Sequence, residues 1–77
     1  MVRDTTYSLS VYIKDKIIKC NKERNWMPHQ LCERSGVSGA TISLILNDNR
    51  LARLDTIMAI SEAYDMSLSD FFSDYKN

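Results

Sequence analysis

The sequence predicts an all-α fold with a helix-turn-helix at its centre. Residues 28–47, PHQLCERSGVSGATISLILN, read as two short helices joined by a tight turn, and apolar side chains recur at spacings of three and four on both sides of this segment. A chain of 77 residues has room for one small domain, which buries only about 60% of its unfolded surface. We therefore expect residues 1–7 to be a flexible tail and residues 8–75 to form a single domain.

The first helix is expected to run from about Leu9 to Glu23. Its apolar residues form one stripe, which suits a helix that buries a single face. Ser8 directly precedes the pattern and can cap the helix, because a serine hydroxyl accepts a hydrogen bond from a free backbone N–H. The inward residues are expected to be Leu9, Ile13, Ile17 and Cys20.

The central motif carries its own start and stop signals. Gly36 stands where the chain must leave a helix with positive φ, which only a residue without Cβ adopts cheaply. Ser38 is a good N-cap for the helix that follows, and Cys32 is small enough to let the two helices approach. The inward residues of the motif are expected to be Leu31, Cys32, Val37, Ile42 and Ile45.

Two further helices are expected after a polar turn at residues 47–50. The first spans about Leu54 to Tyr64, and the second begins after Met66, where Ser67 and Asp70 can form an acidic capping box. Helical spacing assigns inward positions to Leu54, Ile57, Met58, Ile60, Ser61 and Tyr64, and then to Leu68, Phe71 and Phe72. Tyr75 and part of Phe72 are left for a dimer contact.

Several classes of protein are disfavoured by the composition. Apolar residues never run for 18 positions and no charged-then-apolar leader is visible, so we expect a cytoplasmic protein without a membrane span. Cys20 and Cys32 fall at inward positions and are expected to behave as small apolar residues rather than as a disulfide. With one histidine, no paired cysteine spacing, no Gly-rich phosphate loop and no nucleophile patterned with a base, we expect no metal, no cofactor and no catalysis.

The net charge is zero, but it is unevenly distributed along the chain. Through Arg53 there are nine basic and five acidic residues, a net of +4, and from Leu54 onward one basic and five acidic residues give a net of −4. The basic half contains the central motif and could face phosphate while the acidic half faces away. The alternative is that the division arises by chance on two solvated faces.

The motif also resembles a known family. KERNW (22–26), QLCERSGVS (30–38), ATISLILN (40–47) and LDTIMAISEAYDMSLSDFF (54–72) are similar to the Cro/C1-type, or XRE-type, helix-turn-helix domains of phage repressors and bacterial regulators. The resemblance implies a compact five-helix, lambda-repressor-like domain, usually a dimer, whose third helix enters the major groove. It places Trp26 where an apolar side chain staples the first helix to the second.

This sequence departs from its relatives at the start of the second helix. Relatives usually have a Ser or Thr cap and then a Gln that reaches a phosphate, where this chain has Met27 and Pro28. Pro28 suits the first helical position because its missing N–H would be unpaired there. His29 and Gln30 are the nearest polar substitutes, and the helix N-terminus can still present N–H groups to a phosphate.

The outward face of the third helix is poor in polar side chains. Relatives often have Gln at the position of Gly39 and Arg or Lys near Leu44, residues that pair with base edges. We therefore expect T-rich half-sites, in which hydroxyl and amide groups reach base edges, apolar groups reach thymine methyls, and DNA shape or bridging water adds specificity. The residues on this face are Gly39, Ala40, Ser43, Leu44 and Asn47, with Thr41 at its flank.

The favoured interpretation is sequence-specific binding of double-stranded DNA by a homodimeric transcriptional regulator. Resemblance alone favours a repressor, acting on a phage, a mobile element or a neighbouring operon. The residues expected to contact DNA are Pro28, His29, Gln30, Ser38, Gly39, Ala40, Thr41, Ser43, Leu44, Asn47, Asn49 and Arg50. The alternative is a helix-turn-helix scaffold used mainly for protein interaction, antitoxin-like or regulatory, because exposed apolar residues on a groove face often mark a partner. Its contact residues would be Leu44, Leu46 and Leu51.

Overall fold

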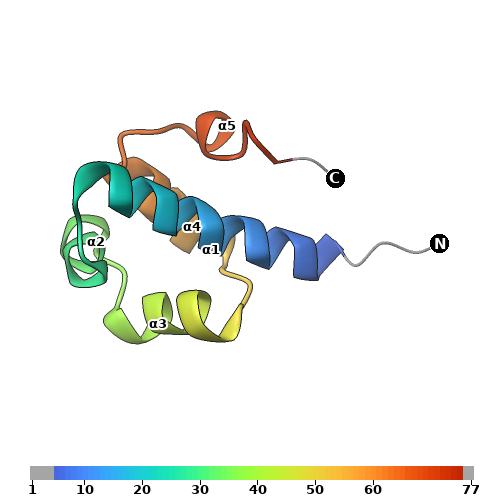
Figure 1. The fold of residues 1–77 in the computed structure, drawn as a ribbon, viewed down its shortest axis with the longest axis horizontal. Coiled ribbons are helices and arrows are strands. Elements are labelled where there is room, and N and C mark those ends of the chain that lie inside the picture. The colour runs from blue at the N-terminus through green and yellow to red at the C-terminus, as the bar shows by residue number, and fades with distance from the viewer. Residues whose placement is uncertain (1–4, 76–77) are drawn as a thin grey trace.

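The computed structural model describes the backbone of residues 5–75 and the side chains of residues 8–75, so the first four residues of the expected tail lie outside it. Over this range the chain is all-helical, with α1 (Thr5–Arg24), α2 (Pro28–Ser35), α3 (Gly39–Asp48), α4 (Leu54–Ala63) and α5 (Leu68–Phe71). The long α1 runs the length of the molecule, with α3 on one side of it and α5 on the other (Figure 1). The predicted all-α, five-helix fold with a central helix-turn-helix is confirmed.

The core is formed by one face of each helix. The predicted stripes of α1 and of the motif are correct in register, since Ile17 and Leu31 are fully buried and Ile42 is 1% exposed. The buried apolar residues are Ile13, Ile17, Cys20, Leu31, Ile42, Ile45, Ile57, Ile60, Tyr64 and Phe71. Leu9, Cys32 and Val37 are half-buried and pack against them. Both cysteines are free, and burial raises the pKa of the Cys20 thiol, which keeps it protonated.

Left-handed backbone residues end the helices and reverse the chain. Gly36 has φ 76° and its N–H donates to the Cys32 carbonyl, as predicted. Asn25, Asn49 and Asp65 also have positive φ, a conformation that Asn and Asp tolerate better than most residues. The turn expected at 47–50 begins two residues later than predicted, because α3 continues through Asp48 and the chain reverses at Asn49.

Three other predictions are wrong in detail. Ser8 does not cap α1, because the helix begins at Thr5 and the Ser8 hydroxyl instead lies 3.2 Å from the Tyr75 hydroxyl. Leu54 and Met58 are not inward, with exposed fractions of 63% and 44%. Leu54 is the first residue of α4, and Met58 lies about 100° around the helix from the buried Ile57, so neither faces the core.

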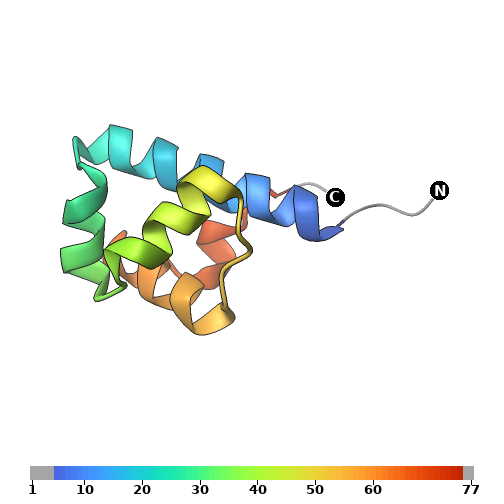
Figure 2. The ribbon, with the colours of Figure 1, turned by 90° about the horizontal axis from the view of Figure 1, so that it is seen from below.

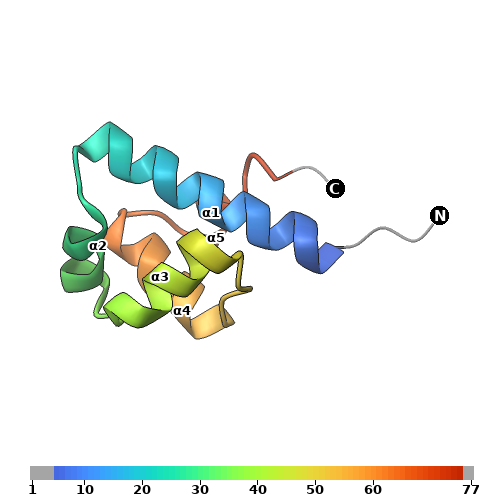
Figure 3. The same ribbon diagram turned by 60° about the horizontal axis from the view of Figure 1, so that its bottom comes forward.

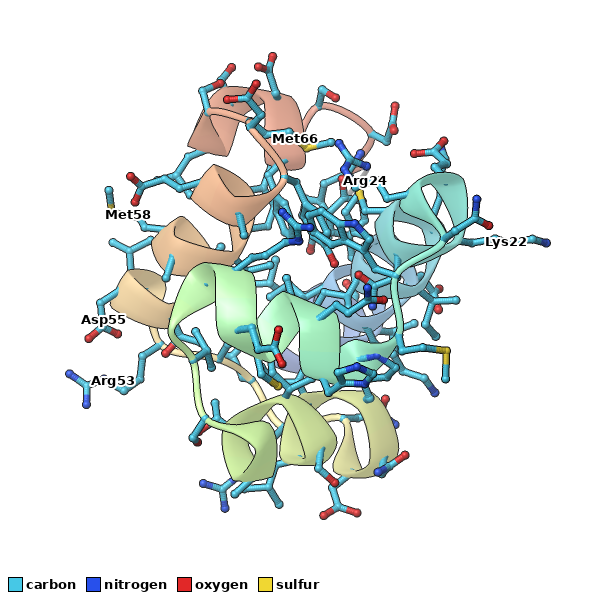
Figure 4. The ribbon with its side chains drawn as sticks, turned by 90° about the vertical axis from the view of Figure 1, so that its left-hand side faces the viewer. Lys22, Arg24, Arg53, Asp55, Met58 and Met66 are labelled. Atoms are coloured by element: carbon cyan, nitrogen blue, oxygen red, sulfur yellow. The ribbon has the colours of Figure 1, made fainter. Side chains whose placement is uncertain are left out.

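An aromatic and arginine cluster joins α1, α2 and α4. The Trp26 ring stacks on Tyr64 at 5.5 Å, which confirms a packing role for Trp26, and the Arg34 guanidinium lies 4.6 Å from the centre of the indole. The Arg24 guanidinium, labelled in Figure 4, lies 5.0 Å from the centre of the Tyr64 ring and donates to the carbonyls of Cys20 and Tyr64 at 3.2 and 3.0 Å. The Arg24 side chain thus satisfies the carbonyl at the C-terminus of α4 and adds a hydrogen bond to the last turns of α1.

The short α5 is held on α1 by the Tyr12 ring. Tyr12 stacks on Phe72 and meets Tyr75 edge-on at 5.2 Å, and its hydroxyl donates to the Phe71 carbonyl. The predicted capping box at the start of α5 is confirmed, since the Ser67 hydroxyl accepts from the Asp70 N–H at 3.0 Å and the Asp70 carboxylate accepts in return. The Tyr75 and Phe72 rings, expected to be left for a dimer, already pack within the chain.

Candidate nucleic-acid interface

The turn between α2 and α3 fixes the direction in which α3 leaves the body. Ser38 caps α3 as predicted, accepting from the Thr41 N–H at 3.2 Å and donating to the Thr41 hydroxyl at 2.9 Å. Thr41 is thereby turned toward the cap and is half-buried rather than fully outward. The amides of Gly39 and Ala40, in the first turn of α3, have no helical partner and can donate to an incoming oxygen.

The outer side of α3 is open to solvent over most of its length. Gly39, Ala40, Ser43 and Asn47 are exposed, and Leu44 is half-buried at the flank. α3 lies at the lower edge of the molecule in Figure 1, and in the view from below no other helix covers it (Figure 2). The Asn47 amide nitrogen donates to the Ser43 hydroxyl oxygen at 3.0 Å, so these two side chains form one unit instead of acting separately.

The start of α2 lies beside this face. Pro28 occupies the first helical position, and both Pro28 and His29 are exposed. The Gln30 side-chain carbonyl accepts from the Met27 N–H at 2.6 Å, which is the return half of a capping box, while the Met27 side chain makes no cap hydrogen bond. Only the Gln30 amide NH₂ is then left to reach a phosphate, so Gln30 has one role in the fold and one available at the surface.

The loop after α3 supplies the positive charge. Asn49 and Arg50 are exposed, and the Arg50 N–H donates to the Leu44 carbonyl at 3.2 Å, which fixes the loop against the end of α3. In the described part of the chain Arg50 belongs to no ion pair, whereas Arg53 lies 3.4 Å from the Asp55 carboxylate. Figure 4 shows Arg53 and Asp55 together at the start of α4.

This arrangement of an exposed helix, a capped turn and a cationic loop agrees with the family that the sequence matches. A family model described as Cro/C1-type HTH DNA-binding domain matches residues 9–77. The chain belongs to this family. No significant match was found among curated proteins or among solved structures. Membership establishes DNA binding and regulation in general terms, and among the described residues no helix is both long and apolar enough to cross a bilayer.

The three leucines expected as an apolar partner face do not form one patch. Leu46 is half-buried and packs against the core, so it is not the exposed residue that the sequence suggested. Leu44 is also half-buried and lies about 160° from Leu46 around α3, on the opposite flank. Leu51 alone of the three is exposed, at 39%. Among the side chains that the structure describes, four large apolar ones are more exposed than Leu51, namely Leu54 and Met58 on α4, Ile18 on α1 and Met27 just before α2.

A hollow of about 340 Å³ opens between α2 and α3, and sequence reasoning missed it. Pro28 and Cys32 line it from α2, and Gly39 and Leu46 line it from α3. Family members often have Gln at both Pro28 and Gly39, so the small residues on facing helices were the available signal. Their combined effect depends on the placement of the two helices, which lie side by side in Figure 3.

The electrostatics of this face differ from those of a strongly basic DNA binder. The exposed residues on the outer side of α3 are uncharged until Asp48, and Arg50 follows two residues later. Acidic side chains on α4 and α5, and in the turns that follow each helix, include Asp55, Glu62, Asp65 and Asp70. In Figure 1, α5 lies on the side of α1 opposite α3, which keeps the acidic side chain of α5 away from the outer side of α3.

Proposed function

We propose that this protein is a homodimeric repressor that binds a specific operator in double-stranded DNA, with α3 in the major groove. The observation that carries the proposal is the exposed outer face of α3, bounded by the start of α2 on one side and by Arg50 on the other. A helix of these dimensions fits the major groove, which is about 12 Å wide. Repression then needs only occupancy of the operator.

Phosphate contacts would come from both edges of this face. The amides at the start of α2 and α3, the Gln30 amide, Asn49 and Arg50 are the donors nearest the backbone of a duplex docked on α3. About four to six such contacts give a slope of log affinity against log salt of about −4 to −5. Ser43 and Asn47 are the side chains placed to hydrogen-bond to base edges, with Ala40 and Leu44 in position for apolar contact.

The test is an in vitro selection of the purified protein against a randomised duplex library, at two salt concentrations. The expected result is an inverted repeat with T-rich half-sites about one helical turn apart. Ala40→Glu places a carboxylate at the second residue of α3, where the helix tolerates it, and should abolish binding by phosphate repulsion. Ser69→Glu makes the same change at the second residue of α5 and should leave binding unchanged.

A second candidate function is protein interaction, favoured by the exposed Leu51, Leu54 and Met58 side chains. If protein interaction is the main function, the selection enriches no duplex even at low salt, and Ala40→Glu leaves binding of the protein partner unchanged. A Leu54→Asp variant should then lose the partner. Steep salt dependence together with loss of binding in Ala40→Glu would exclude this candidate as the main function.

A further inference from the structure

The hollow between α2 and α3 has an apolar floor and polar side chains at its rim. Its floor is apolar, formed by Cys32, Ile42 and Leu46, and Ser43 and Asn47 stand on the side that faces away from the core. It adjoins the exposed surface of α3 from which base contacts are expected. An apolar recess at that place would be filled by water, or by an apolar group, when DNA is bound.

The opening of the hollow depends on Gly39. A Cβ built at Gly39 meets nothing within 4 Å, and the backbone there is not in the left-handed region, so the fold does not require glycine at this position. The missing side chain at Gly39 therefore leaves the hollow open at the surface and is not needed for packing of the core. Pro28 lines the same hollow from α2 and has no flexible side chain to reach across it.

Hydrogen bonding at the rim has a defined direction. The Ser43 oxygen accepts from the Asn47 amide at 3.0 Å, and this is the only hydrogen bond of the Ser43 side chain within residues 8–75. A hydroxyl that has accepted one hydrogen bond keeps its own hydrogen to donate. The rim consequently presents a donor beside an apolar recess.

Among the four bases, thymine alone presents the complementary pair of groups in the major groove, a 5-methyl beside the O4 acceptor. Cytosine has no methyl there and offers an N4 donor in place of the acceptor. We propose that the hollow receives the 5-methyl group of one thymine in each half-site, with the Ser43 hydroxyl donating to O4 of the same base. The inference rests on the proposed DNA-binding function and adds the base and the subsite.

The experiment uses duplexes recovered from the selection, with each thymine replaced in turn by deoxyuridine, which removes only the 5-methyl group. One position in each half-site should lose about fourfold in affinity, equivalent to about 0.8 kcal/mol at about 1.4 kcal/mol per tenfold. The protein variant is Gly39→Leu, whose side chain fills the hollow. It should reduce the thymine-to-uracil affinity ratio at that position to about one.

Two further variants make the result interpretable. Ser69→Leu adds the same side chain at an exposed position of α5 and should keep the fourfold ratio. Gly39→Ala is the milder substitution if Gly39→Leu no longer binds, and it should lower the ratio without lowering the melting temperature. Each measurement is the ratio of the affinities of one protein variant for the thymine and uracil duplexes. A substitution that changes the affinity for both duplexes equally therefore leaves the ratio unchanged.

The outcomes separate the subsite from the function. Steep salt dependence and a recovered operator, without a uracil-sensitive position, would overturn the subsite and leave the DNA-binding proposal standing. A uracil-sensitive position that Gly39→Leu and Gly39→Ala leave unchanged would also overturn it, because the methyl would then be contacted elsewhere, for example by Ala40 or Leu44. Failure to enrich any duplex would overturn both proposals.

Discussion

Replacing Ile42 by alanine tests the placement of α3, on which the reading face depends. Ile42 is 1% exposed, and an Ile-to-Ala change at a buried site costs about 2 to 5 kcal/mol, through lost transfer energy and the cavity left behind. A domain of 77 residues has a free energy of unfolding of about 4 to 12 kcal/mol at the usual value per residue. The variant should therefore lose a large fraction of the stability of the protein.

The assay is urea unfolding followed by Trp26 fluorescence. Trp26 reports on the core because it stacks on Tyr64, which is 1% exposed. A loss of about 3 kcal/mol corresponds to a fall of about 12 to 24 °C in melting temperature for a domain of this size. Leu54→Ala is the control, because Leu54 is 63% exposed and its truncation should change stability by less than about 0.5 kcal/mol. Equal transition midpoints for the two variants would refute the buried placement of Ile42.

Four further outcomes follow from the same geometry. Gly36→Ala should destabilise the protein by about 1 to 2 kcal/mol in urea unfolding, because φ is 76° there while a Cβ would have free space. Ser43→Ala and Asn47→Ala should each weaken operator binding by about 1 to 3 kcal/mol in DNA titrations. The double variant should lose less than the sum of the two, because the side chains share a hydrogen bond, and additive losses would contradict this. Arg50→Ala should weaken all duplexes alike and flatten the salt slope by about one unit, and an unchanged slope would remove Arg50 from the phosphate contacts. Burial raises the pKa of Tyr64, so the folded state favours the protonated phenol. The free energy of unfolding should therefore fall as pH rises above about 10, the pKa of tyrosine in the unfolded chain. Tyr64→Phe should remove part of that fall when melting temperature is measured against pH.

Features of the fold that depend on neighbouring residues in the sequence were predictable. Gly36 ends α2 and Ser38 caps α3 because both effects arise within a few residues of backbone. The Ser67 and Asp70 box is local in the same sense. The stripes of α1 and α3 were also correct, since a helix with one buried face shows its inward residues by spacing alone.

Features that depend on a distant partner were not predictable. The Ser8 hydroxyl lies beside Tyr75, 67 positions away, and this contact has no trace in the sequence around Ser8. In the sequence Arg24 is a charged residue in the connection between the first two helices. In the structure its guanidinium donates to the carbonyl of Tyr64 at the end of α4. Leu54 was assigned inward by spacing, because spacing does not show where the core ends along a helix axis.

In the candidate site, too, the local features were predictable and those that depend on two helices were not. Its outward residues on α3 were found by periodicity, and their exposure follows from the buried Ile42 and Ile45 on the other side. The hollow was not found, because it results from small residues at Pro28 and Gly39 on two different helices. The pairing of Ser43 with Asn47 is four residues apart on one helix and could have been anticipated from helical geometry.

The small number of polar groups on α3 has an energetic consequence for how the protein must bind. If their energies were additive, two side-chain contacts at about 1 to 3 kcal/mol each and one buried methyl at about 0.8 kcal/mol would give a single face about 3 to 7 kcal/mol of base discrimination. The hydrogen bond that Ser43 shares with Asn47 makes that sum an upper limit. Specific binding generally exceeds non-specific binding by about 4 to 10 kcal/mol, so one such face reaches only the lower part of that range. Two faces on an inverted repeat double the contribution without any further charge. A third helix without a basic residue, with the exposed Arg50 beside it, therefore supports the proposed dimeric operator binder, and single half-sites should not be enriched in the selection.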